Sequence, residues 1–346
     1  MTQDSKVRLD QLDLKILREM ETDGRQPLSD LAKKLGTSRA NTSRKLKRLL
    51  DLKVTRIVAF TNPLVLGYRT NAIIGINVSP REIHETAEKL AALHDVHLVI
   101  IAAGRHDIIV WTMFQTPTDL SSFLGRDLGM IPSITSTETM IVLETKKQSF
   151  DLLASSNMVV NDGKYEEPFT QEQLADRDAS LGIDHLDLMI LKELEIDARQ
   201  SVSDLAKKLG TSRGNVSNKL QRLLNQQLTK IVAFTNPLTL GYNVFSLTGI
   251  KISPNEIDAA AKRLSELPEV YTVAKVAGRY DIVVQTMFHT PIEQSAFLMK
   301  ELSNIPGITS TETMIALELR KMSFMYLVLS HLEAKGQLNN SQMILK

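Results

Sequence analysis

The sequence predicts an α+β protein made of two copies of one module, in which a small helical domain is followed by a β-α-β-β-α-β domain. The string SDLAKKLGTSR stands at 29–39 and again at 203–213. Between 10–150 and 184–324, 82 of 141 positions are identical without a gap, which indicates that a whole module has been duplicated. In each copy the apolar spacing changes from helical to strand-like, near residue 52 in the first, so each module contains two domains.

The composition excludes several classes of site. The 346-residue chain contains no cysteine, which removes disulfides, thiolate zinc sites, iron–sulfur clusters and cysteine nucleophiles. No apolar run approaches the roughly 18 residues that span a bilayer, and the N-terminal stretch lacks the apolar region of a signal peptide. We therefore expect a cytoplasmic protein. The net charge is only +1, so attraction to nucleic acid requires local clusters of cations.

The first helix of each copy has a clear start signal. Asp10 is placed as an N-cap, with Asp13 three residues later as an acidic variant of the capping box, and Asp184 and Asp187 repeat the pair. Helical spacing then predicts a buried stripe. Its residues are Leu14, Leu17 and Met20, matched by Leu188, Leu191 and Leu194.

A second and a third helix follow in a recognisable pattern. The second is expected from Ser29 to just before Gly36, because glycine is favoured where a helix ends in left-handed geometry. Thr37 and Ser38 begin the third helix. A three-residue turn with glycine between a short helix and a longer one is the helix-turn-helix pattern, whose later helix enters the major groove of DNA.

The third helix has an apolar side and a basic side. Its core positions are Thr42, Leu46 and Leu49. Residues 1–60 contain 14 Lys and Arg against 8 Asp and Glu, a local excess of positive charge that the whole chain lacks. The alternative is that these cations only solvate an exposed helix.

The side chains on the basic side suit the reading of DNA. Arginine and asparagine can form bidentate contacts with guanine and adenine, so Arg39, Asn41 and Arg44 are candidates for base reading. Lys47 and Arg48 are candidates for phosphate contacts. The full candidate set is Ser38, Arg39, Asn41, Ser43, Arg44, Lys47 and Arg48, with Ser212, Arg213, Asn215, Ser217, Asn218, Gln221 and Arg222 in the second copy.

The second recognition helix is the less basic of the two. Asn218 stands where the first copy has Arg44, and Gln221 stands where it has Lys47. If both copies bind, they should read non-identical half-sites, because arginine suits guanine and asparagine suits adenine. If only one binds, we expect it to be the first.

The second half of each module predicts strands and helices in the order β-α-β-β-α-β. The strand-like runs in the first copy are VTRIVAF, which precedes the unit, and then IIGINV, VHLVIIAA, HDIIVWTMF and TETMIVLE. Helices are expected from Ser79-Pro80 and from Pro117 to about Met130. This order is that of the ferredoxin-like fold, which covers one sheet face with two helices and leaves the other face for pairing. We expect the two sheets to pair face to face within the chain.

These observations divide the chain into six parts. We expect helix-turn-helix domains at 1–60 and 184–234, ferredoxin-like effector and oligomerisation domains at 61–150 and 235–325, a linker with one short helix at 151–183, and a C-terminal tail at 326–346.

The sequence resembles the Lrp/AsnC family of bacterial and archaeal regulators. The resemblance rests on LDxLDxKIL at the start of the first half, and on IVAFTNPLxLGY between the domains and a G-R-[HY]-D turn, in this order, in both halves. It implies a transcription regulator that binds double-stranded DNA, dimerises through its sheets and binds a small effector, commonly an amino acid, between subunits. Ordinary members carry one module, so two modules imply a covalently tethered pseudo-dimer that associates further through other chains.

The resemblance also implies where the effector binds. The residues carried over are Gly104, Arg105, His106, Asp107, Thr137 and Thr139, with Gly278, Arg279, Tyr280, Asp281, Thr311 and Thr313 in the second copy. In this interpretation Asp107 and Asp281 pair with an ammonium group. The alternative is purely structural, with the glycine shaping the turn and the aspartate satisfying backbone amides.

Two other functions remain to be weighed. Some tetrapyrrole decarboxylases of the siroheme type share this two-domain architecture in paired copies, but the seven histidines here do not match one another at the 174-residue offset. We therefore expect no catalytic residues, no metal and no cofactor, and no enzyme activity. The other alternative is a ligand-binding scaffold that has lost DNA binding.

Overall fold

The computed structural model describes residues 7–149, 153 and 182–322. Apart from Leu153, Gly182 and Ile183, the predicted linker at 151–183 lies outside these residues, and so does the predicted tail at 326–346. The described residues form two compact units. Residues 7–61, 149, 153 and 182–242 form the head unit, and residues 62–148 and 243–322 form the barrel unit.

The head unit contains two three-helix heads, one from each copy. The helices are α1 (Gln11–Thr22), α2 (Leu28–Lys34), α3 (Arg39–Asp51), α7 (His185–Ile196), α8 (Val202–Lys208) and α9 (Arg213–Asn225). The predicted capping boxes are confirmed: the Asp10 carboxylate accepts the Asp13 amide at 2.9 Å, and the Asp13 carboxylate accepts the Asp10 amide at 3.0 Å. Asp184 and Asp187 form the same pair at the start of α7.

The turn between the second and third helices also follows the prediction. Gly36 ends α2 with a φ of +63°, which L side chains adopt at a cost. Ser38 caps α3 through a hydrogen bond from the Asn41 amide. The predicted start of α2 was one residue late, because Pro27 takes the N-cap position and Leu28 is already helical. The core positions Thr42, Leu46 and Leu49 are buried as predicted.

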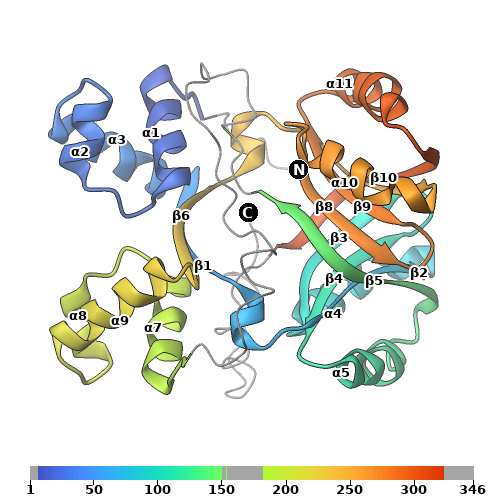
Figure 1. Ribbon diagram of the computed structural model, residues 1–346, viewed down its shortest axis with the longest axis horizontal. Helices are drawn as coiled ribbons and strands as arrows, with labels where there is room; N and C mark the ends of the chain where they lie inside the picture. The colour runs from blue at the N-terminus through green and yellow to red at the C-terminus, as the bar shows by residue number, and fades with distance from the viewer. Residues whose placement is uncertain (1–6, 150–152, 154–181, 323–346) are drawn as a thin grey trace. The chain divides into compact units, whose positions relative to one another are not determined.

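A two-stranded antiparallel ribbon, with one strand from each copy, joins the two heads. Strand β1 (Thr55–Thr61) pairs antiparallel with β6 (Thr229–Thr235), so that Thr55 lies opposite Thr235. Helix α1 packs against β6 of the other copy, and α7 packs against β1 (Figure 1). The Gly24 amide donates to the Ile231 carbonyl at 2.8 Å. Each head is therefore completed by a strand from the other copy.

The barrel unit closes eight antiparallel strands into one sheet. The strands are β2 (Thr70–Val78), β3 (Val96–Ala103), β4 (Ile108–Phe114), β5 (Ile134–Gln148), β7 (Val244–Ile252), β8 (Val270–Ala277), β9 (Ile282–Phe288) and β10 (Ile308–Met322). Around the barrel their order is β10-β3-β4-β2-β5-β8-β9-β7, with β7 pairing back to β10. The copies meet where β5 pairs with β8 and where β10 pairs with β3.

Helices cover the outside of the barrel. They are α4 (Ile83–Ala92), α5 (Pro117–Ser122), α10 (Ile257–Ser265) and α11 (Pro291–Ala296). Short 3-10 segments are η1 (Pro63–Leu66), η2 (Pro80–Glu82), η4 (Pro237–Leu240), η5 (Pro254–Glu256) and η7 (Leu302–Asn304), and π-helical segments are η3 (Phe123–Leu128) and η6 (Phe297–Glu301). The helix predicted from Pro117 to about Met130 is thus α5 followed by a π-helical continuation.

The barrel unit has three apolar cores. Two of them lie between a copy's helices and the outer face of its own strands. The third fills the barrel interior and draws side chains from both copies, among them Trp111, Met140 and Met314. The sheets therefore share an interior, as expected of pairing faces, and are also hydrogen-bonded along both edges. The predicted fold class, two helix-turn-helix domains and two ferredoxin-like domains, is confirmed.

Candidate functional sites

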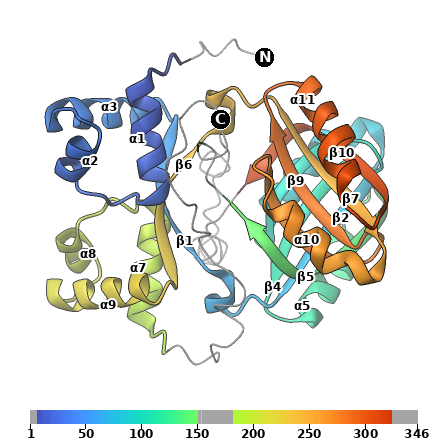
Figure 2. The same ribbon diagram turned by 45° about the horizontal axis from the view of Figure 1, so that its top comes forward.

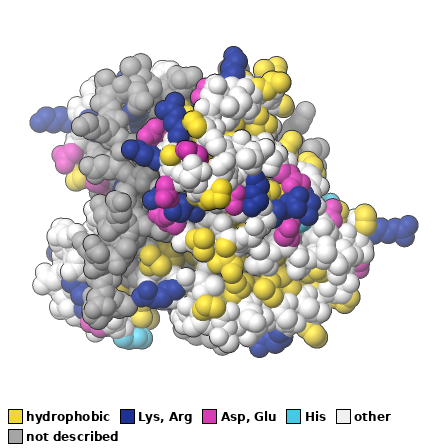
Figure 3. Space-filling model, turned by 45° about the vertical axis from the view of Figure 1, so that its right-hand side comes forward, with side chains coloured by type: hydrophobic (Ala, Val, Ile, Leu, Met, Phe, Trp, Pro, Cys, Tyr) yellow, Lys and Arg dark blue, Asp and Glu magenta, His cyan; other side chains and the backbone are white. Residues whose placement is uncertain are grey.

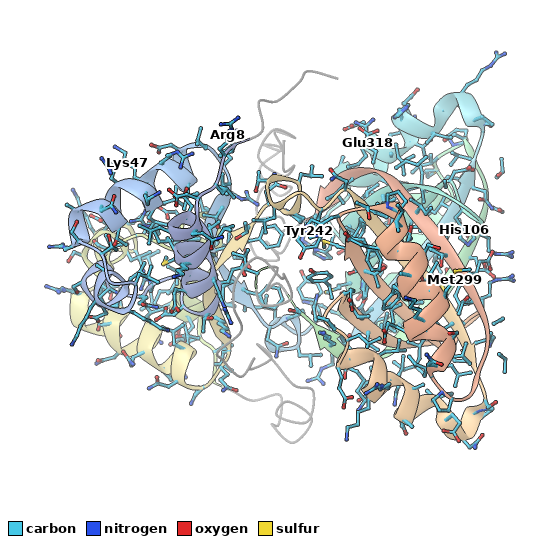
Figure 4. The ribbon with its side chains drawn as sticks, turned by 90° about the horizontal axis from the view of Figure 1, so that it is seen from above. Arg8, Lys47, His106, Tyr242, Met299 and Glu318 are labelled. Atoms are coloured by element: carbon cyan, nitrogen blue, oxygen red, sulfur yellow. The ribbon has the colours of Figure 1, made fainter. Side chains whose placement is uncertain are left out.

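The recognition helix of the first head presents three exposed cations that form no ion pair with a carboxylate of the described residues. Arg39, Arg44 and Lys47 are exposed on α3, and Lys47 lies on the outer side of the helix (Figure 4). Arg44 Nη2 donates to Asn41 Oδ1 at 2.9 Å, while Asn41 Nδ2 donates to Thr37 Oγ1 at 3.0 Å. The Asn41 amide is thereby held in one orientation, as is favourable for a side chain that reads a base edge. Ser43 is exposed, and the Ser38 hydroxyl is engaged as the cap.

The recognition helix of the second head differs in charge. Arg213, Ser217, Asn218 and Gln221 are exposed on α9, and of these only Arg213 is a cation. Asn215 Nδ2 donates to Thr211 Oγ1 at 3.1 Å, as in the first head, and Ser212 again caps the helix. Asn218 occupies the position equivalent to Arg44, so the arginine that donates to the asparagine amide in the first head has no counterpart on α9.

Two of the predicted DNA contacts are engaged inside their own heads. Arg48 Nη1 lies 3.1 Å from the buried Asp13 carboxylate, and Lys45 lies 3.0 Å from it. Arg222 lies 2.5 Å from the equivalent buried carboxylate of Asp187. These contacts tie each recognition helix to the first helix of its head. They give the guanidinium groups of Arg48 and Arg222 a structural role that does not require DNA.

Flanking carboxylates strengthen this attachment. Lys219 Nζ lies 2.5 Å from Asp184, and its hydrogen bond lowers the pKa of Asp184 to about 2. The hydrogen bond from Lys45 likewise lowers the pKa of Asp10. The sequence reasoning missed this role of the aspartates, since it treated them as helix caps alone. Their contact with basic residues of the third helix is a tertiary relation that spacing within one helix does not reveal.

The predicted effector turns lie at the junctions between the copies. Gly104 has a φ of +142° and Gly278 a φ of +146°. A Cβ on Gly104 would lie 3.2 Å from Cγ of Met314, and one on Gly278 would lie 3.2 Å from the carbonyl oxygen of Thr139. Each turn therefore packs against the last strand of the other copy's domain.

The aspartates of these turns bind backbone. Asp107 Oδ2 accepts the Val78 amide at 2.9 Å, and Asp281 Oδ2 accepts the Ile252 amide at 2.9 Å. Asp281 also accepts Lys251 Nζ at 3.0 Å. These contacts are those of the structural alternative, in which the aspartate satisfies a strand amide.

A glutamate that the sequence reasoning missed lies at the centre of each turn site. Glu138 Oε2 accepts Arg105 Nε at 2.9 Å and contacts His106 Nε2 at 3.1 Å. Burial raises the pKa of Glu138, but the Arg105 hydrogen bond and charge outweigh it and hold that pKa below its ordinary value. The signal was present: the repeated string TSTETMI places this glutamate between the two threonines that were selected.

The second copy builds the same cluster with a different aromatic residue. Glu312 Oε2 accepts Tyr280 Oη at 2.6 Å and Arg279 Nε at 3.2 Å. The Tyr280 hydrogen bond lowers the pKa of Glu312, while burial raises the pKa of Tyr280 to about 12. The charge of Arg105 also lowers the pKa of Glu312, so the two clusters are electrostatic neighbours.

The aromatic rings explain two invariant glycines of the repeat. His106 lies against Gly75, and Tyr280 lies against Gly249, so closely that a Cβ at either glycine would overlap the ring. Burial lowers the pKa of His106. Of the threonines selected from sequence, Thr313 Oγ1 lies 3.0 Å from Thr248 Oγ1. Thr137 and Thr311 are exposed, and Thr139 is half-buried.

Two features that the described residues lack bear on other functions. Within residues 7–149, 153 and 182–322 there is no group of three His, Asp or Glu side chains placed to hold a metal ion. In the same part of the chain, no helix has the length and apolar character needed to cross a membrane.

Comparison with known families accounts for both parts of each module. The AsnC-type helix-turn-helix domain matches residues 9–50 and 183–224. The Lrp/AsnC ligand binding domain matches residues 71–152 and 246–326. Both domains therefore occur twice, in the order that the duplication predicts.

Known relatives correspond to one module each. An uncharacterized HTH-type transcriptional regulator of Pyrococcus furiosus is 37% identical over 143 residues, which are 41% of this chain and 97% of the relative. The HTH-type transcriptional regulator FL11 of Pyrococcus abyssi is 32% identical over 148 residues, 42% of this chain and 97% of the relative.

A solved structure extends the likeness to both modules. The siroheme decarboxylase NirDL matches 95% of this chain and 100% of its own with a TM-score of 0.62 at 13% identity. At that identity the likeness shows a shared fold alone. The relatives with higher identity are named transcriptional regulators, so the chain is classed with regulators and not with enzymes. Because both domains match and these relatives are similar over nearly their whole length, the chain belongs to the Lrp/AsnC family of transcriptional regulators.

Proposed function

We propose that this regulator binds double-stranded DNA in the cytoplasm through α3 and α9, as a covalently tethered pseudo-dimer, and responds to a small effector. The observation that carries the proposal is the joining of two exposed, basic recognition helices by the β1–β6 ribbon. Because each head packs on a strand of the other copy, the two helices are held as one reading unit. Paired helices of this kind suit two half-sites of one operator.

The proposal is tested with a double substitution, Arg39→Ala with Arg44→Ala. Operators are first selected from random duplexes with the unaltered chain. The variant should lose about 1–3 kcal/mol of discrimination for each base contact removed, measured as the affinity ratio between operator and random DNA. Lys33→Ala, which removes an exposed cation from α2, serves as the matched control. Equal discrimination by the variant and the control would favour the scaffold that has lost DNA binding.

The two half-sites should differ. Arg44 and Lys47 of α3 correspond to Asn218 and Gln221 of α9, so the surfaces that meet DNA are not equivalent. We expect operators with guanine at the position read by Arg44 and adenine at the equivalent position of the other half. A perfectly palindromic set of selected operators would contradict this expectation.

We further propose that the effector is an amino acid bound at the clusters of Glu138 and Glu312. Asp107 and Asp281 already accept strand amides, which leaves the two glutamates as the carboxylates for an ammonium group. Arg105 and Arg279 supply guanidinium groups for the effector carboxylate. Support comes from the position of these groups at junctions between the copies, where a bound ligand would affect the structure of both copies.

Calorimetric titration with single amino acids tests the effector proposal. At least one amino acid should bind the unaltered chain, and the double variant Glu138→Gln with Glu312→Gln should weaken binding at least tenfold by removing the charge. Glu85→Gln, on the exposed side of α4, is the control. Binding that is unchanged in the double variant would contradict this site.

We also propose self-association of whole chains through the barrel unit. Figure 3 shows hydrophobic side chains grouped on one face of this unit. On β5 and β10, Leu143 is 65% exposed and Leu317 is 67% exposed, at equivalent positions of the two copies. Light scattering should give a multiple of the chain mass, and Leu143→Glu with Leu317→Glu should reduce it. A single-chain mass at micromolar concentration would contradict the proposal.

A further inference from the structure

The head unit contains a cavity that the reading of DNA does not use. Its volume is about 330 Å³, and it lies between the segment before α2 and the segment before α8. Figure 2 shows these two segments facing each other between the heads. Sites for small molecules in proteins commonly have about 300–1,000 Å³, so this cavity lies at the lower end of that range.

One wall of the cavity is a fixed guanidinium group. Arg25 reaches across to the other copy, where its Nε donates to the Ala198 carbonyl at 2.9 Å and its Nη2 donates to the Gln200 carbonyl at 2.6 Å. These two hydrogen bonds hold the guanidinium in place. Burial lowers the pKa of Arg25, which shows that its charge is partly removed from water. A cation in this condition interacts strongly with an anion that enters the cavity.

The equivalent arginine of the second copy is available. Arg199 lines the same cavity, is exposed, and has no side-chain partner among the described residues. Asp23 and Asp197 are the nearby carboxylates, and their charges act on Arg25. Each is already engaged, since Asp23 accepts the Arg25 amide and Asp197 accepts the Arg199 amide, both at 2.9 Å.

Four of the side chains that line the cavity are apolar. Met20 and Leu46 belong to the buried core of the first head and reach the cavity, where Leu28 and Val202 join them. The cavity therefore combines two guanidinium groups with a cluster of apolar side chains. Small-molecule sites use apolar side chains for contact area and a few polar groups to fix the orientation of the ligand.

We propose that this cavity binds a small organic carboxylate with an apolar tail. The carboxylate pairs with Arg25 and Arg199, and the tail packs on Met20, Leu46 and Val202. The lining comes from both copies, so the bound molecule bridges the two heads. This site is separate from the clusters of the barrel unit, and the proposal does not depend on whether an amino acid binds there.

Calorimetry with hexanoate tests the proposal, with hexylamine and 1-hexanol as probes of the same tail and a different head group. Hexanoate should bind, and the other two should bind at least tenfold more weakly. Arg199→Gln should weaken hexanoate binding about tenfold without affecting folding, because among the described residues this side chain has no hydrogen bond or ion pair to lose. Glu138→Gln should leave the binding of hexanoate unchanged.

Three outcomes would overturn the proposal. Equal binding of hexanoate and 1-hexanol would mean an apolar gap without anion recognition, and it would overturn the proposal. Absence of hexanoate binding would mean that the cavity recognises no such carboxylate, and it would also overturn the proposal. Hexanoate binding that survives Arg199→Gln and is lost in Glu138→Gln would place the anion in the barrel unit and would equally overturn it.

Discussion

The different charge of the two recognition helices leads to a prediction about salt. On α3 the exposed cations at reading positions are Arg39, Arg44 and Lys47, whereas α9 offers only Arg213. The double variant Arg44→Asn with Lys47→Gln gives α3 the residues of α9. If both cations neutralise phosphates, the slope of log affinity against log salt should become less negative by about 1.8, since each phosphate contributes about 0.9.

The magnitude is easily measured. Between 50 and 200 mM salt, a slope difference of about 1.8 changes the relative affinity about 12-fold. Fluorescence anisotropy with a labelled random-sequence duplex is sufficient, because this electrostatic contribution does not depend on sequence. The variant should bind more weakly at low salt, and its affinity should approach that of the unaltered chain as salt rises.

The second head supplies the matched control. Asn218→Arg with Gln221→Lys gives α9 the residues of α3 and should make the slope more negative by about 1.8. Slopes that stay equal in all three proteins would refute the reasoning, because the exposed cations would then not meet phosphates. A change in the first variant without one in the second would mean that only the first head binds DNA.

Three further predictions concern stability. Gly24→Ala should cost about 1–3 kcal/mol in urea unfolding, because the added Cβ would lie 2.9 Å from the backbone of Val232; an unchanged free energy of unfolding would disprove this close approach. Asp13→Ala should cost about 1–3 kcal/mol, since two cations lose a buried partner, and a loss below experimental error would contradict the anchoring role. Burial, aided by the charge of Lys321, lowers the pKa of His97 well below its ordinary value, so its contribution to stability is complete above about pH 6.5 and declines as the pH falls. His97→Tyr, which copies Tyr271 of the second module, should reduce the loss of stability in acid, as thermal unfolding across that pH range will show.

The local features of the heads could be predicted because neighbouring residues determine them. The capping pair of Asp10 and Asp13, the end of α2 at Gly36 and the buried Leu46 all follow from spacing within one or two turns. Of the base-reading candidates on α3, Arg39 and Arg44 are exposed and Asn41 is half-buried, since core spacing leaves them away from the apolar side.

The relations between the copies could not be predicted in the same way. The strand at 55–61 has the pattern of any β-branched strand, and nothing in that pattern indicates a partner in the other copy. Closure of the barrel depends on edges that are far apart in sequence. A helical projection of α3 alone places Arg48 on the exposed side and predicts a phosphate contact. It cannot show the partner Asp13, because Asp13 belongs to another helix. The repeated string TSTETMI contains Glu138, but its contacts with Arg105 and His106 become visible only when the turn at 104–107 lies beside β5.

The ribbon of β1 and β6 has a consequence for how such a protein can diverge. Two separate genes for half-length chains would give a mixture of like and unlike pairs, since the strand of either product could complete the helices of either. Fusion removes the like pairs, because each half finds its missing strand in the same polypeptide. Every molecule then carries one of each reading surface, and selection can alter one surface without creating a competing assembly.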